Sequence, residues 1–556
     1  MAAPTAAPAL CTLVCLCLVF ALVTPTPLPS SPTRVTVDPS TGHLVDAHGR
    51  VRVFHGQNVV QKRTPYHPAP AGFDTTNTLS AADADFLANM GANFVRLGVM
   101  WPGVEPTLGQ FNDTYLQVVR GIIATLGDRD IYVLLDFHQD LFATSLCGEG
   151  FPLFATNITT ETCNSIFSKV GHVVGACKSL YNDYGVHVDP SGMANITDCL
   201  RAPFGLLYAT PEVSSAFESF YRSPALQDLF VRYWTRTVAA LAAIPTVIGI
   251  DIINEPWPGD VWDHPSLLIP GRTDRLRLQP LYQRVASAVH QTTQLMASAP
   301  INIFYEPTPF PDSILKLVSP IGFNALPGPA EASVLSYHVY CCTQGEHACD
   351  HDGNPLPSTP CDAFNSELVN KRADDARRLG GGAFLTEFGA CTHGEQCVRE
   401  IHRTAAAADE HFHSWAYWQY KFYDDVTTQS GPTEGLWDAS GALIKEKYRA
   451  LSRTYAQAIA GVPKKMTFDP TTAMFSLVYI HKKAAGNAPT QIYFHSTEYY
   501  DGAPEINCSP AGVTCSDVTP ISQGSNTGGM LLSVAADVAD GTTVEVSLAR
   551  KTPPQQ

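Results

Sequence analysis

The stretch Ile250-Asp251-Ile252-Ile253-Asn254-Glu255-Pro256-Trp257 closes a short apolar run that begins at Val247. The run is rich in β-branched residues and almost free of charge, which is typical of a strand buried on both faces of a parallel sheet. Pro256 cannot donate to a ladder, so the strand ends before it. The strand therefore delivers an amide, Asn254, and a carboxylate, Glu255, to the C-terminal edge of the sheet. Taken alone, Glu255 fits a solvated strand end as well as a catalytic group.

Seven further apolar runs of similar length occur along the chain, and helical stretches separate several of them. The predicted strands are Val53–Val60, Phe94–Met100, Ile131–Phe137, Val247–Ile253, Ile301–Tyr305, Val334–Val339, Ala383–Phe388 and Trp415–Trp418. The clearest predicted helices are Ala81–Met90, Tyr115–Leu126, Leu226–Ala243 and Leu281–Ala297. Eight strands that alternate with helices predict a (β/α)8 TIM barrel, in which catalytic groups lie at the C-terminal ends of the strands.

The pattern changes near Gly461-Val462-Pro463. Beyond this point come short alternating strands, predicted at Met474–His481, Gln491–Glu498, Met530–Val534 and Thr543–Leu548. They indicate a small C-terminal β-sandwich. We expect a signal peptide at 1–28, a barrel domain at 29–461 and the β-sandwich at 462–556. A short hairpin around Gly49, between residues 34–37 and 51–54, is expected before the first barrel strand.

The composition narrows the possible functions. The 556 residues carry a net charge of −16, which argues against binding to nucleic acid and against electrostatic docking on an anionic membrane. Residues 10–23 form an uncharged apolar run that is too short to span a bilayer comfortably, so we interpret it as a secretory signal. No Lys or Arg precedes this run, which leaves an uncleaved anchor as the alternative. The protein is expected outside the cell or in the lumen of an acidic digestive compartment.

Twelve cysteines lie outside the predicted signal and fall into even local groups. These are Cys147, Cys163, Cys177 and Cys199; Cys341, Cys342, Cys349 and Cys361; Cys391 and Cys397; and Cys508 and Cys515. The grouping predicts disulfides, although it leaves the pairing within the groups of four open. A zinc site is the alternative, but the chain has no CxxC pair. Glycosylation sequons at Asn112, Asn157, Asn195 and Asn507 agree with secretion.

Two long connections carry many of these cysteines. The segment from about Cys147 to Phe220 is too long for a simple loop, and we interpret it as an excursion that forms a wall or lid on the catalytic face. The stretch 341–362 is a second excursion. Within it, Asp350–Asn354 faintly suggests a calcium loop, but the bidentate Glu is missing, so a turn is favoured.

A second carboxylate repeats the arrangement around Glu255. Ala383–Gly389 is an apolar strand that ends in Thr386-Glu387-Phe388-Gly389, so Glu387 is also expected at the mouth of the barrel. Two carboxylates across a cleft are the minimal apparatus for hydrolysis of a glycosidic bond. One must stay protonated near the working pH while the other is ionised, and their surroundings can arrange this difference.

Asn254-Glu255-Pro256 on the fourth strand and Thr386–Gly389 on the seventh together resemble glycoside hydrolase family 5, a family of retaining (β/α)8 enzymes. Other strand ends resemble the same family, namely Arg96 on the second strand, His138 after the third, His338 and Tyr340 on the sixth, and Trp418 on the eighth. Within the family, the chain is most similar to endoglycoceramidases, which release the intact glycan from glycosphingolipids and leave ceramide. That likeness rests on His55–Lys62, Leu134–Asp140, Asp251–Trp257, Tyr337–Cys341 and Leu385–Ala390.

The resemblance implies a role for each candidate residue. Glu255 would be the general acid/base, and Glu387 would be the nucleophile that forms a glycosyl-enzyme. Asn254 would bind the sugar 2-hydroxyl. The others are expected around the substrate: Tyr340 and His338 orient the carboxylates, Asp136, Lys62 and His138 bind sugar hydroxyls, Trp418 stacks on the sugar, and Arg96 lies near the nucleophile. The carboxyl groups are expected about 5–5.5 Å apart, which is the retaining spacing.

Several of these residues also have ordinary structural explanations. Arg96 suits the neutralisation of a buried carboxylate, Lys62 suits a solvated loop, and Tyr340 and Trp418 suit packing. Glu306 follows the fifth predicted strand and would be catalytic only if the strand count were wrong.

The sequence predicts a secreted, monomeric, retaining endo-glycosidase of glycosphingolipids that uses no metal or cofactor and touches a membrane or lipid micelle transiently. The alternatives are a β-glucosidase for glucosylceramide or a steryl glucoside, an endo-β-glucanase, and a catalytically inactive glycan- or lipid-binding protein. Only seven Trp residues argue against a long glucan cleft, and the two carboxylates argue against inactivity. An apolar wall for the lipid is expected from Phe142, Phe151, Leu153, Phe154, Leu206, Leu207 and Trp262.

Overall fold

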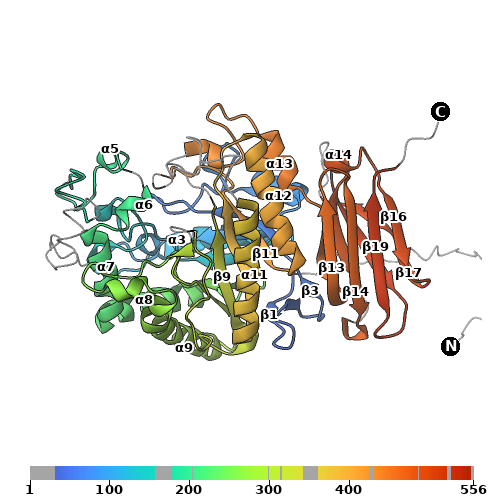
Figure 1. The fold of residues 1–556 in the computed structure, drawn as a ribbon, viewed down its shortest axis with the longest axis horizontal. Coiled ribbons are helices and arrows are strands. Elements are labelled where there is room, and N and C mark those ends of the chain that lie inside the picture. Colours follow the sequence, from blue (N-terminus) through green and yellow to red (C-terminus); the bar gives the residue numbers. More distant parts are fainter. Residues whose placement is uncertain are drawn as a thin grey trace, which may run out of the picture.

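The computed structural model describes residues 32–156, 177–202, 204–298, 300–312, 316–341, 361–425, 427, 431–485, 488–521 and 528–551. A closed β-barrel surrounded by helices lies beside a β-sandwich along the long axis of the molecule (Figure 1). Several predicted features lie outside the described residues. They are the signal at 10–23, the sequon at Asn157, the cysteines Cys163, Cys342 and Cys349, and the turn at Asp350–Asn354.

The barrel consists of eight parallel strands, as the sequence predicts. They are β4 (His55–Val59), β5 (Phe94–Gly98), β6 (Tyr132–Asp136), β7 (Val247–Asp251), β8 (Asn302–Tyr305), β9 (Ser333–Val339), β10 (Gly382–Gly389) and β11 (Ser414–Trp418). The strands follow one another around the barrel, and β11 pairs with β4 to close it. Every residue of these strands is buried, which explains their continuous apolar runs. The (β/α)8 prediction is confirmed.

Helices cover the outside of the barrel. Those described are α1 (Ala81–Met90), α2 (Trp101–Val104), α3 (Asp113–Gly127), α5 (Ile196–Cys199), α6 (Phe204–Leu207), α7 (Pro211–Arg222), α8 (Pro224–Leu241), α9 (Gln279–Leu295), α11 (Cys361–Leu379), α12 (Gly394–Glu410) and α13 (Lys445–Leu451). One more short helix, α14 (Ser496–Tyr499), belongs to the sandwich (Figure 1). Local sequence sets their ends. Ser80 and Asp83 form a capping box on α1, and Gly91 ends that helix in the left-handed conformation, with φ of +89°.

The sandwich consists of two antiparallel sheets. The first sheet runs β1 (Val35–Val37), β2 (Leu44–Asp46), β3 (Val51–Arg52), β12 (Tyr455–Ile459), β15 (Thr490–His495), β18 (Gly529–Ala536) and β17 (Val513–Pro520). The second runs β13 (Gly461–Asp469), β14 (Met474–His481), β19 (Thr543–Ala549) and β16 (Glu505–Ser509). One predicted strand, Gln491–Glu498, is too long, because the chain turns into α14 after His495.

The predicted hairpin is wrong in its pairing. Residues 35–37 pair with β2 at Leu44–Asp46, and β2 in turn pairs with β3. The hairpin then joins the sandwich sheet, because β3 pairs with β12 some 400 residues later in the chain. This long-range pairing leaves no local signature in the sequence. Three strands from before the barrel therefore extend a sheet that the sequence assigned to the C-terminal segment alone.

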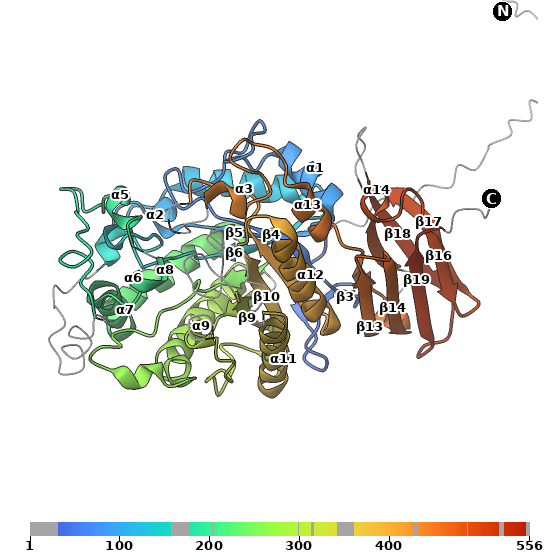
Figure 2. The same ribbon diagram turned by 45° about the horizontal axis from the view of Figure 1, so that its top comes forward.

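The position of the sandwich identifies the open end of the barrel. Val35 and Val37 of β1 pack with Phe54, Phe94 and other barrel residues in one apolar cluster, which closes the N-terminal end of the barrel. The strand β3 lies in the sandwich sheet and leads directly into β4. The C-terminal ends of the strands therefore point away from the sandwich. The helices α5, α6 and α7 of the long excursion lie at this opposite end of the molecule (Figures 1 and 2).

Disulfides fasten the connections. The described pairs are Cys147–Cys199, Cys341–Cys361, Cys391–Cys397 and Cys508–Cys515. The last two confirm the pairs expected from the two-cysteine groups, and the first two resolve part of the pairing that the sequence left open. Cys177 is also disulfide-bonded. In the described part of the chain, no helix combines the length and the apolar character needed to cross a membrane.

Candidate active site

Glu255 lies in a strained turn just beyond β7. Its φ is +39°, a left-handed value that non-glycine residues rarely adopt. Two neighbours hold the turn. The N–H of Glu255 donates to Oε2 of Glu306 at 2.9 Å, and Nε2 of Gln139 donates to the backbone oxygens of Asn254 at 2.7 Å and Glu255 at 3.0 Å. Such strain persists where surrounding contacts fix it, and it concentrates at functional sites. The turn places Oε1 of Glu255 2.8 Å from Nδ1 of His338.

Glu387, on β10, faces Glu255 across the mouth of the barrel. Its Oε1 accepts a hydrogen bond from Nη1 of Arg96 at 2.5 Å, and its Oε2 accepts one from the hydroxyl of Tyr340 at 2.9 Å. His338 also lies nearby, with Nδ1 3.5 Å from Oε2 of Glu387. A carboxylate oxygen of Glu255 and one of Glu387 lie within 4.8 Å of each other. The nearest oxygens of the two groups are thus no farther apart than the carboxyl separation of about 5–5.5 Å expected for a retaining pair.

Arg96 organises the floor of the site. Its guanidinium donates to the carboxylates of Asp136 (2.9 Å), Asp251 (3.0 Å) and Glu387 (2.5 Å) and to the amide oxygens of Asn58 (3.2 Å) and Asn254 (3.0 Å). The side chain is fully buried. Although burial disfavours its charge, the three carboxylates raise the pKa of Arg96 above its usual value. Arg96 therefore keeps a permanent positive charge against the nucleophile candidate and fixes the amide of Asn254.

The two facing carboxyl groups have different surroundings. Burial, followed by the charge of Asp140, raises the pKa of Glu255 to about 7. Burial also raises the pKa of Glu387, but the positive charge of Arg96 opposes the shift. Burial lowers the pKa of His338 to about 4, so this ring is neutral at neutral pH. Glu255 therefore holds a proton near neutral pH, whereas Arg96 and the Tyr340 hydroxyl stabilise Glu387 as a carboxylate.

His138 and Trp418 lie together at the C-terminal ends of β6 and β11. Their rings stack, with centroids 5.0 Å apart and planes 17° apart. Nδ1 of His138 lies 2.9 Å from Oδ2 of Asp136, and Nε2 lies 3.5 Å from Oδ2 of Asp140. Burial alone would lower the pKa of His138, but Asp136 and Asp140 raise it to about 10. The polar cluster predicted after the third strand, which includes His138, is therefore in contact with Trp418, the tryptophan predicted on the eighth strand.

Lys62 lies next to Trp418 and is buried among acidic side chains. Its Nζ contacts carboxylate oxygens of Asp140 at 2.6 Å, Asp425 at 3.1 Å and Glu149 at 3.2 Å, and it lies 5.0 Å from the centre of the Trp418 ring. Burial disfavours its charge, yet the three acids raise the pKa of Lys62 well above its usual value. The structure therefore places Lys62 beneath Trp418, where it ties three loops together. Its binding of a sugar hydroxyl stays a prediction.

Comparisons with known proteins agree with this site. Residues 55–424 match the family model described as cellulase (glycosyl hydrolase family 5), and residues 453–547 match the glycoside hydrolase family 5 C-terminal domain. The chain belongs to glycosyl hydrolase family 5. The first match covers the whole barrel and both facing carboxylates.

Two similar proteins are named endoglycoceramidase. One, from Cyanea nozakii, is 31% identical over 523 residues, which are 93% of this chain and 94% of the relative. Another, from Hydra vulgaris, is 32% identical over 481 residues, or 86% and 83% of the two chains. A solved structure of endo-glycoceramidase II from Rhodococcus sp., described as a lactosyl-enzyme intermediate, has a TM-score of 0.67 and 22% identity and covers 92% of this chain and 100% of that chain. This last likeness establishes the common fold.

Several residues that contact the site could not be selected from the sequence. Asn58, Gln139, Glu149 and Asp425 take part through contacts between segments that are distant in the chain. Asp251 carried a signal, because it is the only charged residue of an otherwise apolar strand, and its carboxylate now proves to bind Arg96. Glu306 also takes part in the site, because its carboxyl group accepts a hydrogen bond from the backbone N–H of Glu255.

The predicted apolar wall is largely wrong. Phe142, Phe151 and Leu207 are at most 2% exposed, and Phe154 and Trp262 are partly buried against the same core. The ring of Phe142 stacks on Phe151 with centroids 3.8 Å apart. These residues pack into the main core of the barrel domain, so the base of the excursion contributes to that core and does not offer these side chains to a lipid. Leu153 and Leu206 remain exposed, at 39% and 55%.

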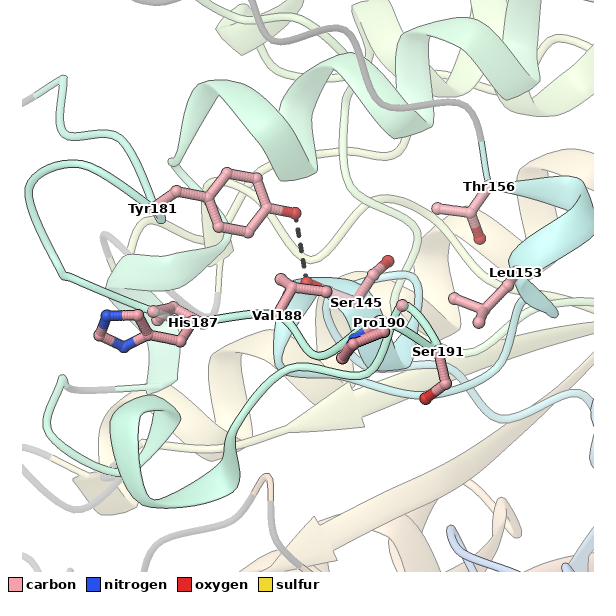
Figure 3. Close-up of a pocket in the computed structure, with 10 residues that line it drawn as sticks. Ser145, Leu153, Thr156, Tyr181, His187, Val188, Pro190 and Ser191 are labelled. Atoms are coloured by element: carbon pink, nitrogen blue, oxygen red, sulfur yellow. Dashed lines mark hydrogen bonds between the residues drawn. The ribbon is translucent and has the colours of Figure 1, made fainter.

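A separate pocket of about 740 Å³ lies in the excursion. Figure 3 shows Leu153, Val188 and Pro190 along its wall, and the hydroxyl of Tyr181 donating to the backbone oxygen of Ser145 at 3.3 Å. The pocket contains none of the residues around the two facing carboxylates. It therefore belongs to the rim of the catalytic end rather than to the catalytic groups.

Proposed function

We propose that this chain is a retaining endo-glycosidase that hydrolyses the β-glycosidic bond between the oligosaccharide and the ceramide of glycosphingolipids. The observation that carries the proposal is the pair Glu255 and Glu387. The two groups approach within 4.8 Å, burial raises the pKa of Glu255 to about 7, and Arg96 binds the carboxylate of Glu387 directly. This is the apparatus of double displacement. The endoglycoceramidase relatives support the choice of substrate.

The first step breaks the bond to the lipid. Glu387 attacks the anomeric carbon while Glu255 gives its proton to the glycosidic oxygen, so ceramide leaves as a neutral alcohol. Arg96 and the Tyr340 hydroxyl hold the attacking carboxylate in place. Asn254, whose amide oxygen is bound by Arg96, is oriented beside the pair for contact with the sugar 2-hydroxyl.

The second step reverses the role of Glu255. Once Glu387 is bonded to the sugar, it no longer carries a negative charge. The pKa of Glu255 then falls, because like charges at this distance raise one another's pKa values. Glu255 becomes a base that takes a proton from water, and the water opens the glycosyl-enzyme. The sugar is released with retained configuration, and both carboxyl groups return to their starting states.

The cellular setting is a further proposal. The disulfides favour an oxidising compartment, which suits a protein that is secreted or that works in a digestive lumen. We propose that the enzyme acts as a monomer and touches a membrane or micelle while it acts. Neither step above calls for a metal or cofactor.

The test is product analysis on three substrates. The wild-type protein should release intact oligosaccharide and ceramide from a labelled ganglioside, and it should leave cellopentaose intact. Glucosylceramide serves as the third substrate and tests the alternative of a simple β-glucosidase. Cleavage of cellopentaose alone would refute the proposal. Glu387→Gln should abolish turnover while circular dichroism shows an unchanged fold, and a Glu387→Gln variant with normal activity would overturn the nucleophile assignment.

A further inference from the structure

Exposed apolar side chains gather on the excursion at the catalytic end. Of the large apolar side chains that the structure describes as exposed, five lie between residues 153 and 206: Leu153 (39%), Val188 (40%), Met193 (40%), Leu200 (51%) and Leu206 (55%). Single exposed apolar residues are normal on soluble proteins, but a group of them marks an interaction site. This group of side chains therefore indicates a surface that contacts another molecule.

Two of the five line the pocket of Figure 3, and a third lies next to a lining residue in the chain. Leu153 and Val188 line it, and Met193 follows the lining residue Gly192 directly in the chain. A β-bridge between Val188 and Ala194 fixes the turn between them. We call Leu153, Val188 and Met193, with the pocket between them, the apolar lip. It is a built surface with a hollow rather than a loose loop tip.

The base of the excursion reaches the catalytic site. The hydroxyl of Tyr208 donates to Oδ1 of Asp140 at 3.1 Å, and Glu149 contacts Lys62. Ser145, which lines the pocket, is five residues from Asp140, a separation of at most about 18 Å along the chain. The disulfide Cys147–Cys199 closes the excursion across its base. The apolar lip is therefore held at the rim of the mouth that receives the substrate.

The low net charge of the excursion suits contact with an uncharged lipid surface. Residues 177–202 contain two basic and three acidic side chains, a formal charge of −1, within a chain whose net charge is −16. Asp198 is further balanced by His187 and Arg201 at 2.8 and 3.0 Å. Such a surface has little to gain from anionic headgroups, so attraction to lipid must come from burial of apolar area.

We propose that the apolar lip docks on the lipid surface that carries the substrate. The inference rests on the proposed function, since a glycosphingolipid in a membrane presents its scissile bond next to the bilayer. Leu153, Val188 and Met193 enter the interfacial region of the bilayer and bring the mouth of the barrel over that bond. Because the contact is apolar, docking does not need anionic lipid and changes little with salt.

The test compares two double variants. Val188→Asp/Met193→Asp places charges on the lip at positions that are already exposed, so the fold should survive. Leu295→Asp/Met474→Asp is the matched control, because these side chains are 82% and 49% exposed and lie at the end of α9 and in the sandwich strand β14. Each protein is mixed with phosphatidylcholine vesicles with and without lactosylceramide, and the sedimented fraction is measured at low and high salt.

The lip variant should bind vesicles roughly tenfold more weakly than the wild type, a loss expected when two half-exposed apolar side chains no longer enter lipid. The control should bind like the wild type, and salt should have little effect. A second assay compares hydrolysis of lactosylceramide in vesicles with that of a short-chain analogue dissolved as monomers. The lip variant should lose activity on vesicles about tenfold and keep its activity on the monomeric analogue.

Three results would overturn the docking proposal: a wild-type protein that does not sediment with vesicles, a lip variant that binds normally, or equal loss on both substrates, which would place the lip in the substrate cleft itself. Failure of the proposed function is distinguishable. In that case the wild type would hydrolyse neither form of lactosylceramide, while sedimentation would still decide whether the lip docks on lipid.

Discussion

Replacement of Tyr340 by Phe removes one hydrogen bond from the nucleophile and leaves the other contacts of the site in place. In the native protein, the Tyr340 hydroxyl donates to Oε2 of Glu387 at 2.9 Å, and Arg96 binds the opposite oxygen. A hydrogen bond to a charged group contributes about 1.5–3 kcal/mol. At about 1.4 kcal/mol per pKa unit, the loss should raise the pKa of Glu387 by about one to two units.

The sign of the effect on activity follows from the role of Glu387. The nucleophile must be ionised, so kcat/KM falls on the acid side as pH drops through the pKa of Glu387. In Tyr340→Phe this acid limb should move to higher pH by the same one to two units, and activity well below the limb should fall roughly 10–100-fold relative to the wild type at equal pH. On the plateau the carboxylate is ionised in both proteins, so the difference there should be smaller.

The assay is a pH profile of kcat/KM for release of oligosaccharide. Tyr493→Phe is the control, because Tyr493 is a buried tyrosine in the sandwich whose hydroxyl donates to the backbone oxygen of Asn89 at 2.8 Å. It should lose stability without any shift of the acid limb. If the acid limb of Tyr340→Phe coincided with that of the wild type, the hydroxyl would not stabilise the ionised nucleophile, and the reasoning would fail.

Three further predictions concern the acid/base group, the buried arginine and the excursion. Glu255 has a pKa of about 7 and acts first as an acid, so kcat/KM should fall as pH rises above about 7. Glu255→Gln should remove this basic limb of the pH profile. The variant should still attack an aryl glycoside slowly, because a good leaving group needs no proton. Arg96→Lys keeps the charge but loses the planar fork that binds several partners, so urea unfolding should show a loss of about 3–5 kcal/mol; a loss below 1 kcal/mol would contradict a buried network. Replacement of both Cys147 and Cys199 by Ser opens a loop with a sequence separation of 52, and the chain-entropy relation gives a loss of about 4 kcal/mol, measured by thermal unfolding without reductant.

The sequence was sufficient for the barrel because the decisive signal is local. Residues 247–253 are apolar on both faces of a strand, and the other seven strands show the same continuous runs, since parallel strands in a barrel are covered on both sides. The strand ends then place Glu255 and Glu387 at one mouth without knowledge of any contact. By contrast, the pairing of β3 with β12 depends on residues about 400 positions apart, and the hairpin prediction failed there.

The same distinction explains the errors around the site. Lys62 could be assigned to the catalytic end, but its acidic partners come from two other connections, Asp140 and Glu149 from the one after β6 and Asp425 from the one after β11, so its burial could not be foreseen. Phe142 and Phe151 were expected to face lipid because they are apolar and lie in a long connection. Composition does not reveal that such a connection packs aromatic rings into the core of the barrel domain, as Phe142 and Phe151 do, while it leaves aliphatic side chains such as Leu153 and Leu206 exposed.

The assignment of acid and nucleophile depends on a third carboxyl group, Glu306, for which the sequence alone predicts no catalytic role. Nδ1 of His338 lies 2.8 Å from Glu255, 3.4 Å from Glu306 and 3.5 Å from Glu387, and the lowered pKa of His338 leaves this ring without charge at neutral pH. Burial and the neighbouring Glu255 raise the pKa of Glu306 well above its usual value, so Glu306 holds a proton of its own and adds no charge to the cleft. Glu306 can therefore fix the strained turn of Glu255 without repelling it. One negative charge then remains for the facing pair, and it resides on Glu387 because Arg96 and Tyr340 bind that carboxylate directly, which leaves the proton on Glu255.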